Sequence, residues 1–178
     1  MSLNRELNLT ENGLSEPPKG ILVPTLEVLD ISYQHPHFYV YNDTFNGASK
    51  MKFLSLNGNR IKNLFVNSLR GLYKLEELRL SNMPVFEYIE ETAFVHVPML
   101  KKLDLSRNPK LSGTTGRTFL GLYNLEELNL AFSSNIASDS GMEGAEFQAK
   151  FLSLDKLRIL NIRCVHVKKP WSYKLPRC

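Results

Sequence analysis

Apolar and polar residues alternate in one fixed pattern along this chain, and the pattern is clearest between Leu100 and Leu111. In that stretch, LKKLDLSRNPKL, leucines stand at the first, fourth and sixth places of an eleven-residue frame, and Asn108 stands at the ninth. The frame starts again and again, at residues 4, 26, 51, 75, 100, 125 and 157. A frame that returns at such short intervals predicts a solenoid of stacked coils.

The alternation inside the frame predicts one short strand per coil. In Leu103-Asp104-Leu105 both leucines lie on one face of a strand and the aspartate lies on the other. A single coil cannot fold alone, because three buried leucine-type side chains return less free energy than ordering some two dozen residues costs. We therefore expect the strands of successive coils to join one parallel sheet above a continuous leucine core.

A second apolar segment precedes most frames and predicts an outer wall. These segments begin at Phe45, Leu69, Phe94 and Phe119, and each is followed within a few residues by the next frame. Their side chains should form a convex row that closes the core from the side opposite the sheet.

The ninth place of the frame predicts a ladder of polar side chains between coils. An asparagine there can bridge donors and acceptors of neighbouring turns that would otherwise be buried without partners. Gln34 can partly substitute for asparagine. We expect the ladder to be broken at three of the seven coils, where the ninth residue is Met83, Ser133 or Val165.

These motifs resemble the typical class of extracellular leucine-rich repeats. The resemblance rests on the F-x-G-L-x-x-L segment before the frame, on a period near 24 and on the N-P-x-L exit at 108–111, and it covers nearly all of the chain. It implies an α/β repeat fold, a curved solenoid of about seven coils with a parallel concave sheet. Toll-type receptors and the adhesion protein chaoptin belong to this class, which implies innate immune or developmental signalling in one case and cell adhesion in the other.

Length and composition add few constraints to this interpretation. With 178 residues, of which 43% are hydrophobic, the chain is long enough for one domain. We predict a repeat array over 1–167 and a tail over 168–178, in which Pro170-Trp171 resembles part of an incomplete cap. The sequence starts inside a repeat without an apolar signal region, so we expect a piece of a longer protein, with any membrane contact made by its other parts.

Several motifs that carry chemistry elsewhere do not complete a site here. His35 and His37 offer two imidazoles to a metal but lack a third ligand. The glycine-rich run 112–118 lacks the spacing and the lysine of a phosphate-binding loop. Cys164 and His166 are as well explained by packing as by nucleophilic catalysis. We expect no enzyme activity, no cofactor and no metal, and the modest net charge of +4 gives no reason to expect nucleic acid as a partner.

Two kinds of covalent modification are predicted. The triplets Asn8-Leu9-Thr10 and Asn42-Asp43-Thr44 are acceptor sequences for N-glycosylation, and Asn42 is the better candidate because it stands in a polar loop. The two cysteines, Cys164 and Cys178, can close one disulfide or remain unpaired, and the sequence leaves both outcomes open.

The exposed side of the predicted sheet is the candidate binding surface. It is lined by the third, fifth, seventh and eighth places of the frames, where arginine and aromatic side chains can anchor a ligand. Glu77, Lys102 and Glu127 can alternatively form a purely structural cross-strand ladder. The candidate ligand-binding residues are Tyr33, Phe53, Arg79, Asn82, Lys102, Asp104, Arg107, Asn129 and Phe132.

The sequence predicts the functional class of the protein but not its ligand. We expect a module of a receptor or adhesion ectodomain, extracellular or at the cell surface, that binds a protein or glycan on its concave face. The alternative is an intracellular, cytoplasmic scaffold or adaptor, which the few cysteines and the missing signal region favour. The insertion at 135–150 in the sixth coil is either a specificity loop or a tolerated surface loop.

Overall fold

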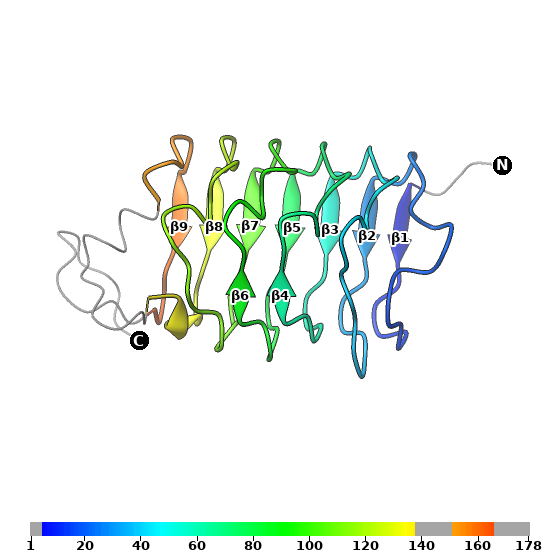
Figure 1. The fold of residues 1–178 in the computed structure, drawn as a ribbon, viewed down its shortest axis with the longest axis horizontal. Coiled ribbons are helices and arrows are strands. Elements are labelled where there is room, and N and C mark those ends of the chain that lie inside the picture. The colour runs from blue at the N-terminus through cyan, green and yellow to red at the C-terminus, as the bar shows by residue number, and fades with distance from the viewer. Residues whose placement is uncertain (1–4, 138–150, 166–178) are drawn as a thin grey trace.

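Seven short parallel strands, one from each frame, lie side by side along the long axis of the molecule (Figure 1). The computed structural model describes residues 5–137 and 151–165. The predicted tail at 168–178 and most of the insertion at 135–150 lie outside this part of the chain. In order across the sheet, the strands are β1 (Glu6–Asn8), β2 (Val28–Asp30), β3 (Phe53–Ser55), β5 (Glu77–Arg79), β7 (Lys102–Asp104), β8 (Glu127–Asn129) and β9 (Ile159–Asn161).

The register of the sheet confirms the predicted fold. Residues at the same place of successive frames pair with one another, so that Leu78 lies opposite Leu103 and Leu103 lies opposite Leu128. All three leucines are buried. The strands delimit about five complete turns, which is slightly fewer coils than the seven predicted. Seven strands bound six intervals, and the interval between β8 and β9 includes residues 138–150, which lie outside the described ranges. Five turns are therefore described in full.

The side opposite the sheet is built from turns and short extended segments. A second, two-stranded sheet joins β4 (Asn63–Leu64) to β6 (Tyr88–Ile89), and a single 3-10 helix, η1 (Ser134–Ala137), follows β8 (Figure 1). Within the described ranges the outer wall contains no α-helix, and no helix there is long and apolar enough to cross a membrane.

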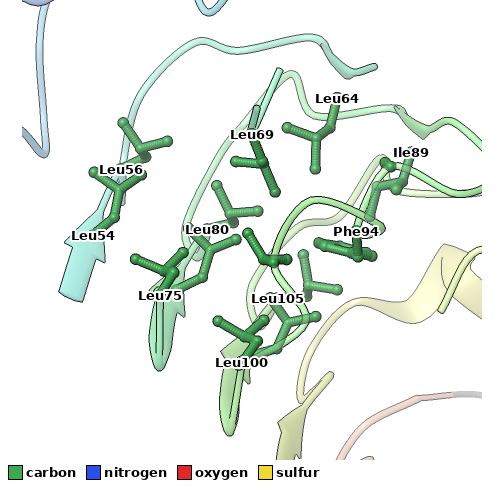
Figure 2. Packing of buried hydrophobic residues seen from close by; sticks show 14 of the residues in the cluster. Leu54, Leu56, Leu64, Leu69, Leu75, Leu80, Ile89, Phe94, Leu100 and Leu105 are labelled. Atoms are coloured by element: carbon green, nitrogen blue, oxygen red, sulfur yellow. The ribbon is translucent and has the colours of Figure 1, made fainter. Parts of the chain in front are cut away.

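Leucines from the strands and aromatic residues from the outer wall meet in one core (Figure 2). Phe45, Leu69, Phe94 and Phe119, which begin the predicted convex segments, are all buried. The rings of Phe94 and Phe119 stack with centroids 6.3 Å apart. The second row of apolar side chains is therefore present as predicted.

The motif glycine in the outer wall is required by close approach of the backbone. A Cβ on Gly71 would lie 2.8 Å from the carbonyl oxygen of Phe45 and 2.9 Å from the Cα of Asn46, both in the preceding coil. Real Cβ atoms do not approach backbone so closely, so only glycine lets the two coils stack at this distance.

Polar side chains at the ninth place bridge neighbouring coils in the core. The side-chain Nδ2 of Asn108 donates to the carbonyl oxygens of Leu80 and Leu105, and its Oδ1 accepts the backbone N–H of Met83 at 2.9 Å. Asn59 and Gln34 make the equivalent bonds two and three coils nearer the N-terminus, Asn59 to Ile31 and Gln34, and Gln34 to Leu9. These bonds satisfy backbone groups that stacking removes from water.

The prediction that Ser133 breaks this ladder is wrong. Its hydroxyl donates to the carbonyl oxygen of Leu105 at 2.7 Å and accepts the backbone N–H of Asn108 at 3.0 Å. A hydroxyl is both donor and acceptor, so Ser133 makes the two bonds to the preceding coil that Asn108 makes to its own preceding coil. Met83 and Val165 are buried apolar residues and contribute no side-chain bridge.

A column of alternating charge runs along the second place of the frames. Glu27 forms ion pairs with Arg5 at 3.2 Å and Lys52 at 2.9 Å, and Lys101 pairs with Glu76 at 2.7 Å. The hydrogen bond from Lys52 lowers the pKa of Glu27, and the bond to Glu76 raises the pKa of Lys101. These pairs are exposed, so each one contributes little to stability.

We predict that Asn108→Ala lowers the free energy of unfolding by about 2–4 kcal/mol, because it leaves buried backbone groups without partners. Urea denaturation measures this loss. Asn12→Ala is the control, since the Asn12 side chain is exposed and its bond among the described residues is to its own turn, through the carbonyl oxygen of Thr10. Equal losses in the two variants would contradict a role for Asn108 in joining the coils.

Candidate functional site

The exposed side of the seven-stranded sheet, here called the sheet face, carries most of the predicted binding residues. The third and fifth places of the frames, on the strands, and the eighth place, in the loops that follow them, are at least partly exposed, except for Ser55 and Gly58, which are buried. A shallow hollow of about 460 Å³ lies across β5, β7, β8 and β9, and its lining includes the predicted residues Arg79, Lys102, Asp104 and Asn129. Four of the nine candidates are thereby brought together.

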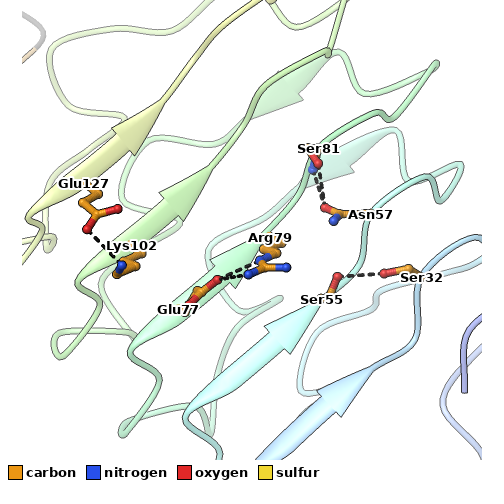
Figure 3. Close-up of polar contacts among 8 residues, drawn as sticks. All are labelled: Ser32, Ser55, Asn57, Glu77, Arg79, Ser81, Lys102 and Glu127. Atoms are coloured by element: carbon orange, nitrogen blue, oxygen red, sulfur yellow. Dashed lines mark hydrogen bonds and ion pairs between the residues drawn. The ribbon is translucent and has the colours of Figure 1, made fainter. Parts of the chain in front are cut away.

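Charged side chains in the middle of the sheet face are paired with one another (Figure 3). Lys102 lies 2.9 Å from Glu127 on the next strand, and the bond to Glu127 raises the pKa of Lys102. Glu77 pairs with Arg79 on its own strand, at 2.6 Å, instead of with Lys102. The alternative cross-strand ladder therefore forms at one of its two rungs, and the centre of the face is close to electrically neutral.

Fifth-place carboxylates and amides hold the loop that follows each strand. Oδ1 of Asp104 accepts the backbone N–H of Ser106 at 2.9 Å, and Oδ1 of Asn129 accepts that of Ala131 at 3.2 Å. The same bond is made by Asn8, Asp30 and Asn161. Such local bonds fix a turn, so Asp104 and Asn129 have a structural task besides any contact with a ligand.

The eighth-place residues, here called the eighth-place row, share an unusual backbone conformation. All of them have φ between 55° and 68°, in the left-handed region. Gly58 and Asn82 suit that region, whereas a residue with a large side chain loses roughly 1–2 kcal/mol there. The row consists of Glu11, Tyr33, Gly58, Asn82, Arg107, Phe132 and Cys164.

Guanidinium groups stack on two aromatic rings of the sheet face. Arg79 lies 4.9 Å from the ring centroid of Phe53. Phe132 receives two cations from the neighbouring coils, Arg107 at 4.8 Å and Arg163 at 5.5 Å. Each such contact is worth about 0.5–1 kcal/mol at an exposed site, and together they hold the ring of Phe132 in place although 37% of the residue is exposed.

A second hollow lies beside this stack. It has a volume of about 290 Å³ and is lined by Asn82, Pro84, Arg107, Pro109 and Phe132. Three of these residues, Asn82, Arg107 and Phe132, were predicted from the sequence. Arg163 was not among the predicted ligand contacts, although a signal for it existed, because the seventh place holds small or uncharged residues in every other frame.

Tyr33 lies at another point of the sheet face, beside the next coil, whose eighth-place residue Gly58 has no side chain. A Cβ on Gly58 would collide with the ring of Tyr33. Because Gly58 has none, the ring occupies the space beside Gly58, and the Tyr33 hydroxyl accepts a 3.4 Å hydrogen bond from Nδ2 of Asn82.

The predicted modification sites lie apart from these hollows. Asn8 and Asn42 are both exposed, as an acceptor asparagine must be, and Asn8 stands on β1 at the edge of the sheet face. Cys164 is disulfide-bonded. Cys178 lies outside the described residues, so the pairing of these two cysteines stays a prediction.

Comparison with known proteins agrees with this architecture. Residues 86–135 match the family model described as leucine rich repeat. Tsukushi from Mus musculus is 32% identical over 71% of this chain and 35% of its own length. Toll-like receptor 3 from Homo sapiens is 27% identical over 89% of this chain and 19% of its own length. The chain thus spans about a third or less of the relatives it matches.

Two solved structures share the fold. One is that of the TLR13–ssRNA13 complex, with a TM-score of 0.70 and 24% identity over 88% of this chain and 25% of that one. The other is that of the mouse RP105/MD-1 complex, with a TM-score of 0.71 and 23% identity over 92% of this chain and 30% of that one. At this identity the likeness establishes the repeat architecture alone.

We predict that Gly58→Ala destabilises the protein by about 1–3 kcal/mol more than Gly113→Ala, because the new methyl group must displace the ring of Tyr33. Gly113 is a matched control, since its φ of 65° is close to the 68° of Gly58 and its nearest contact for a Cβ is at 4.0 Å. Urea denaturation of both variants tests this. Equal destabilisation would mean that Tyr33 does not rest on Gly58.

Proposed function

The chain is a leucine-rich repeat array of the extracellular type, and from that premise we propose that its sheet face binds a protein ligand within a receptor or adhesion ectodomain. Innate immune or developmental signalling and cell adhesion are the processes in which such an ectodomain would act. We place the protein outside the cell or at its surface, in line with the class to which its relatives belong.

The observation that carries this proposal is the pair of guanidinium–aromatic stacks on the exposed sheet. Arg79 with Phe53, and Arg107 with Phe132, combine the residue types that dominate binding energy at protein interfaces. Stacking holds these side chains in place before a ligand arrives, so little side-chain entropy remains to be lost on binding. The sheet beneath them is rigid, because each strand is hydrogen-bonded to its neighbours.

A protein ligand fits this surface better than nucleic acid does. Lys102 and Arg79 are engaged by Glu127 and Glu77, so the centre of the face offers no continuous track of free cations. Binding to a phosphate backbone depends on several unpaired cations in sequence. The solved complexes named above contain either RNA or a second protein, and the charge pairing here supports the second kind of partner.

We predict that this chain, produced by secretion, binds one or a few proteins on an array of secreted and cell-surface ectodomains. Phe53→Ala combined with Phe132→Ala should weaken that binding at least tenfold, which corresponds to about 1.4 kcal/mol. Tyr123→Ala is the control, because Tyr123 is exposed but lies outside the sheet face. Binding that survives the double substitution, in protein with unchanged thermal stability, would place the ligand elsewhere and overturn the proposal.

We also predict that Asn42 carries an N-linked glycan when the protein is made in secretory cells. Treatment with an amidase specific for N-glycans should then increase electrophoretic mobility, and Asn42→Gln should remove most of that shift. Asn46→Gln is the control, since Asn46 is exposed nearby but does not stand in an acceptor triplet. Protein from its native source without any glycan would contradict the extracellular placement.

A further inference from the structure

The arginines stacked on Phe132 differ from the cations at the centre of the sheet face in their ion pairing. Arg107 and Arg163 both lie against the ring, and within 5–137 and 151–165 no carboxylate forms an ion pair with either of them. Arg79 and Lys102, by contrast, each have a carboxylate partner. Within the described part of the chain, the ring therefore holds two guanidinium groups whose N–H edges form no ion pair.

We propose that this end of the sheet face binds an acidic segment of the protein ligand, with carboxylates on Arg107 and Arg163 and an apolar side chain against Phe132. The inference rests on the proposed function and names the chemistry of its partner. A guanidinium held by stacking is well suited to a carboxylate, because its planar fork can donate two parallel hydrogen bonds.

The neighbouring hollow supplies the apolar half of the site. Pro84 and Pro109 line it together with Phe132, and its volume of about 290 Å³ leaves room for a side chain of the ligand. Asn82 and Arg107 place amide and guanidinium donors on the same hollow. A segment in which an aspartate or glutamate stands next to an apolar residue matches both parts.

Backbone conformation gives an independent reason to assign a function to these residues. Arg107 and Phe132 have φ of 55° and 61°, in the left-handed region where Gly58 and Asn82 serve the same place in other coils. Glycine or asparagine would meet the demands of the fold at lower conformational cost. Large side chains in strained backbone are characteristic of sites that contact a ligand.

A long polyanion fits this site poorly. Asp104 stands on β7 in the coil of Arg107, and Glu127 on β8 is paired with Lys102, so the surface beside the two arginines carries one carboxylate and one neutralised ion pair. An extended phosphate or sulfate chain that reached both arginines would meet the negative charge of Asp104 and then a surface without free cations. A short peptide segment can place its carboxylates on the arginines and an uncharged residue beyond them.

The test is selection of peptides from a random display library against the whole chain, followed by affinity measurements on the enriched peptides. We expect enrichment of aspartate or glutamate beside an apolar residue, with affinity that falls as salt is raised. Arg107→Gln combined with Arg163→Gln should weaken binding at least tenfold. Arg70→Gln combined with Arg117→Gln is the matched control, since both arginines are exposed and belong to the outer wall.

The other outcomes separate this inference from the broader proposal. Enriched peptides that are neutral or basic, and that lose binding in Phe53→Ala with Arg79→Gln, would overturn the acidic-segment inference and leave the sheet face as a binding surface. Peptides unaffected by every sheet-face variant would overturn both. Single-stranded RNA or heparin that displaces the acidic peptides and binds more tightly would show a polyanion site and also overturn the inference.

Discussion

Each coil of this protein buries its leucines only against the next coil, and the backbone groups buried with them must find partners across the same junction. Gln34, Asn59, Asn108 and Ser133 meet that requirement with side-chain bonds between coils. Because a bond of this kind forms only when the ninth places of two frames coincide, it also fixes the register of the strands. The parallel sheet and the continuous core both depend on this coincidence.

The same register gives the exposed face its properties. Residues at one place of the frame form a row that crosses the sheet, so a side chain is surrounded by its counterparts from the adjacent coils. Arg107 lies against Phe132, its counterpart in the next coil, for this reason, and Lys102 reaches Glu127 for the same reason. The leucine core does not include these rows, so those of their residues that do not hold a turn can be selected for recognition without loss of the fold.

The structural roles that could be predicted are those that a single residue type fills in a single way. Alternating leucines place every strand of the sheet, and the motif phenylalanines place the outer wall. Choices between two adequate partners could not be predicted: Glu77 had Arg79 and Lys102 within reach, and Ser133 makes bonds that were expected only of asparagine. The left-handed backbone of the eighth place was also missed, because Tyr33, Arg107 and Phe132 are residues that this conformation disfavours.

The second-place column has a bearing on how such an array can change in length. Its residues alternate in sign from coil to coil, as Arg5, Glu27, Lys52, Glu76, Lys101, Glu126 and Arg158. Duplication or deletion of one coil would set two like charges directly opposite each other, which destabilises neighbouring strands. Gain or loss of two coils at once preserves the alternation, so an array that changes length by pairs of repeats keeps its column of ion pairs.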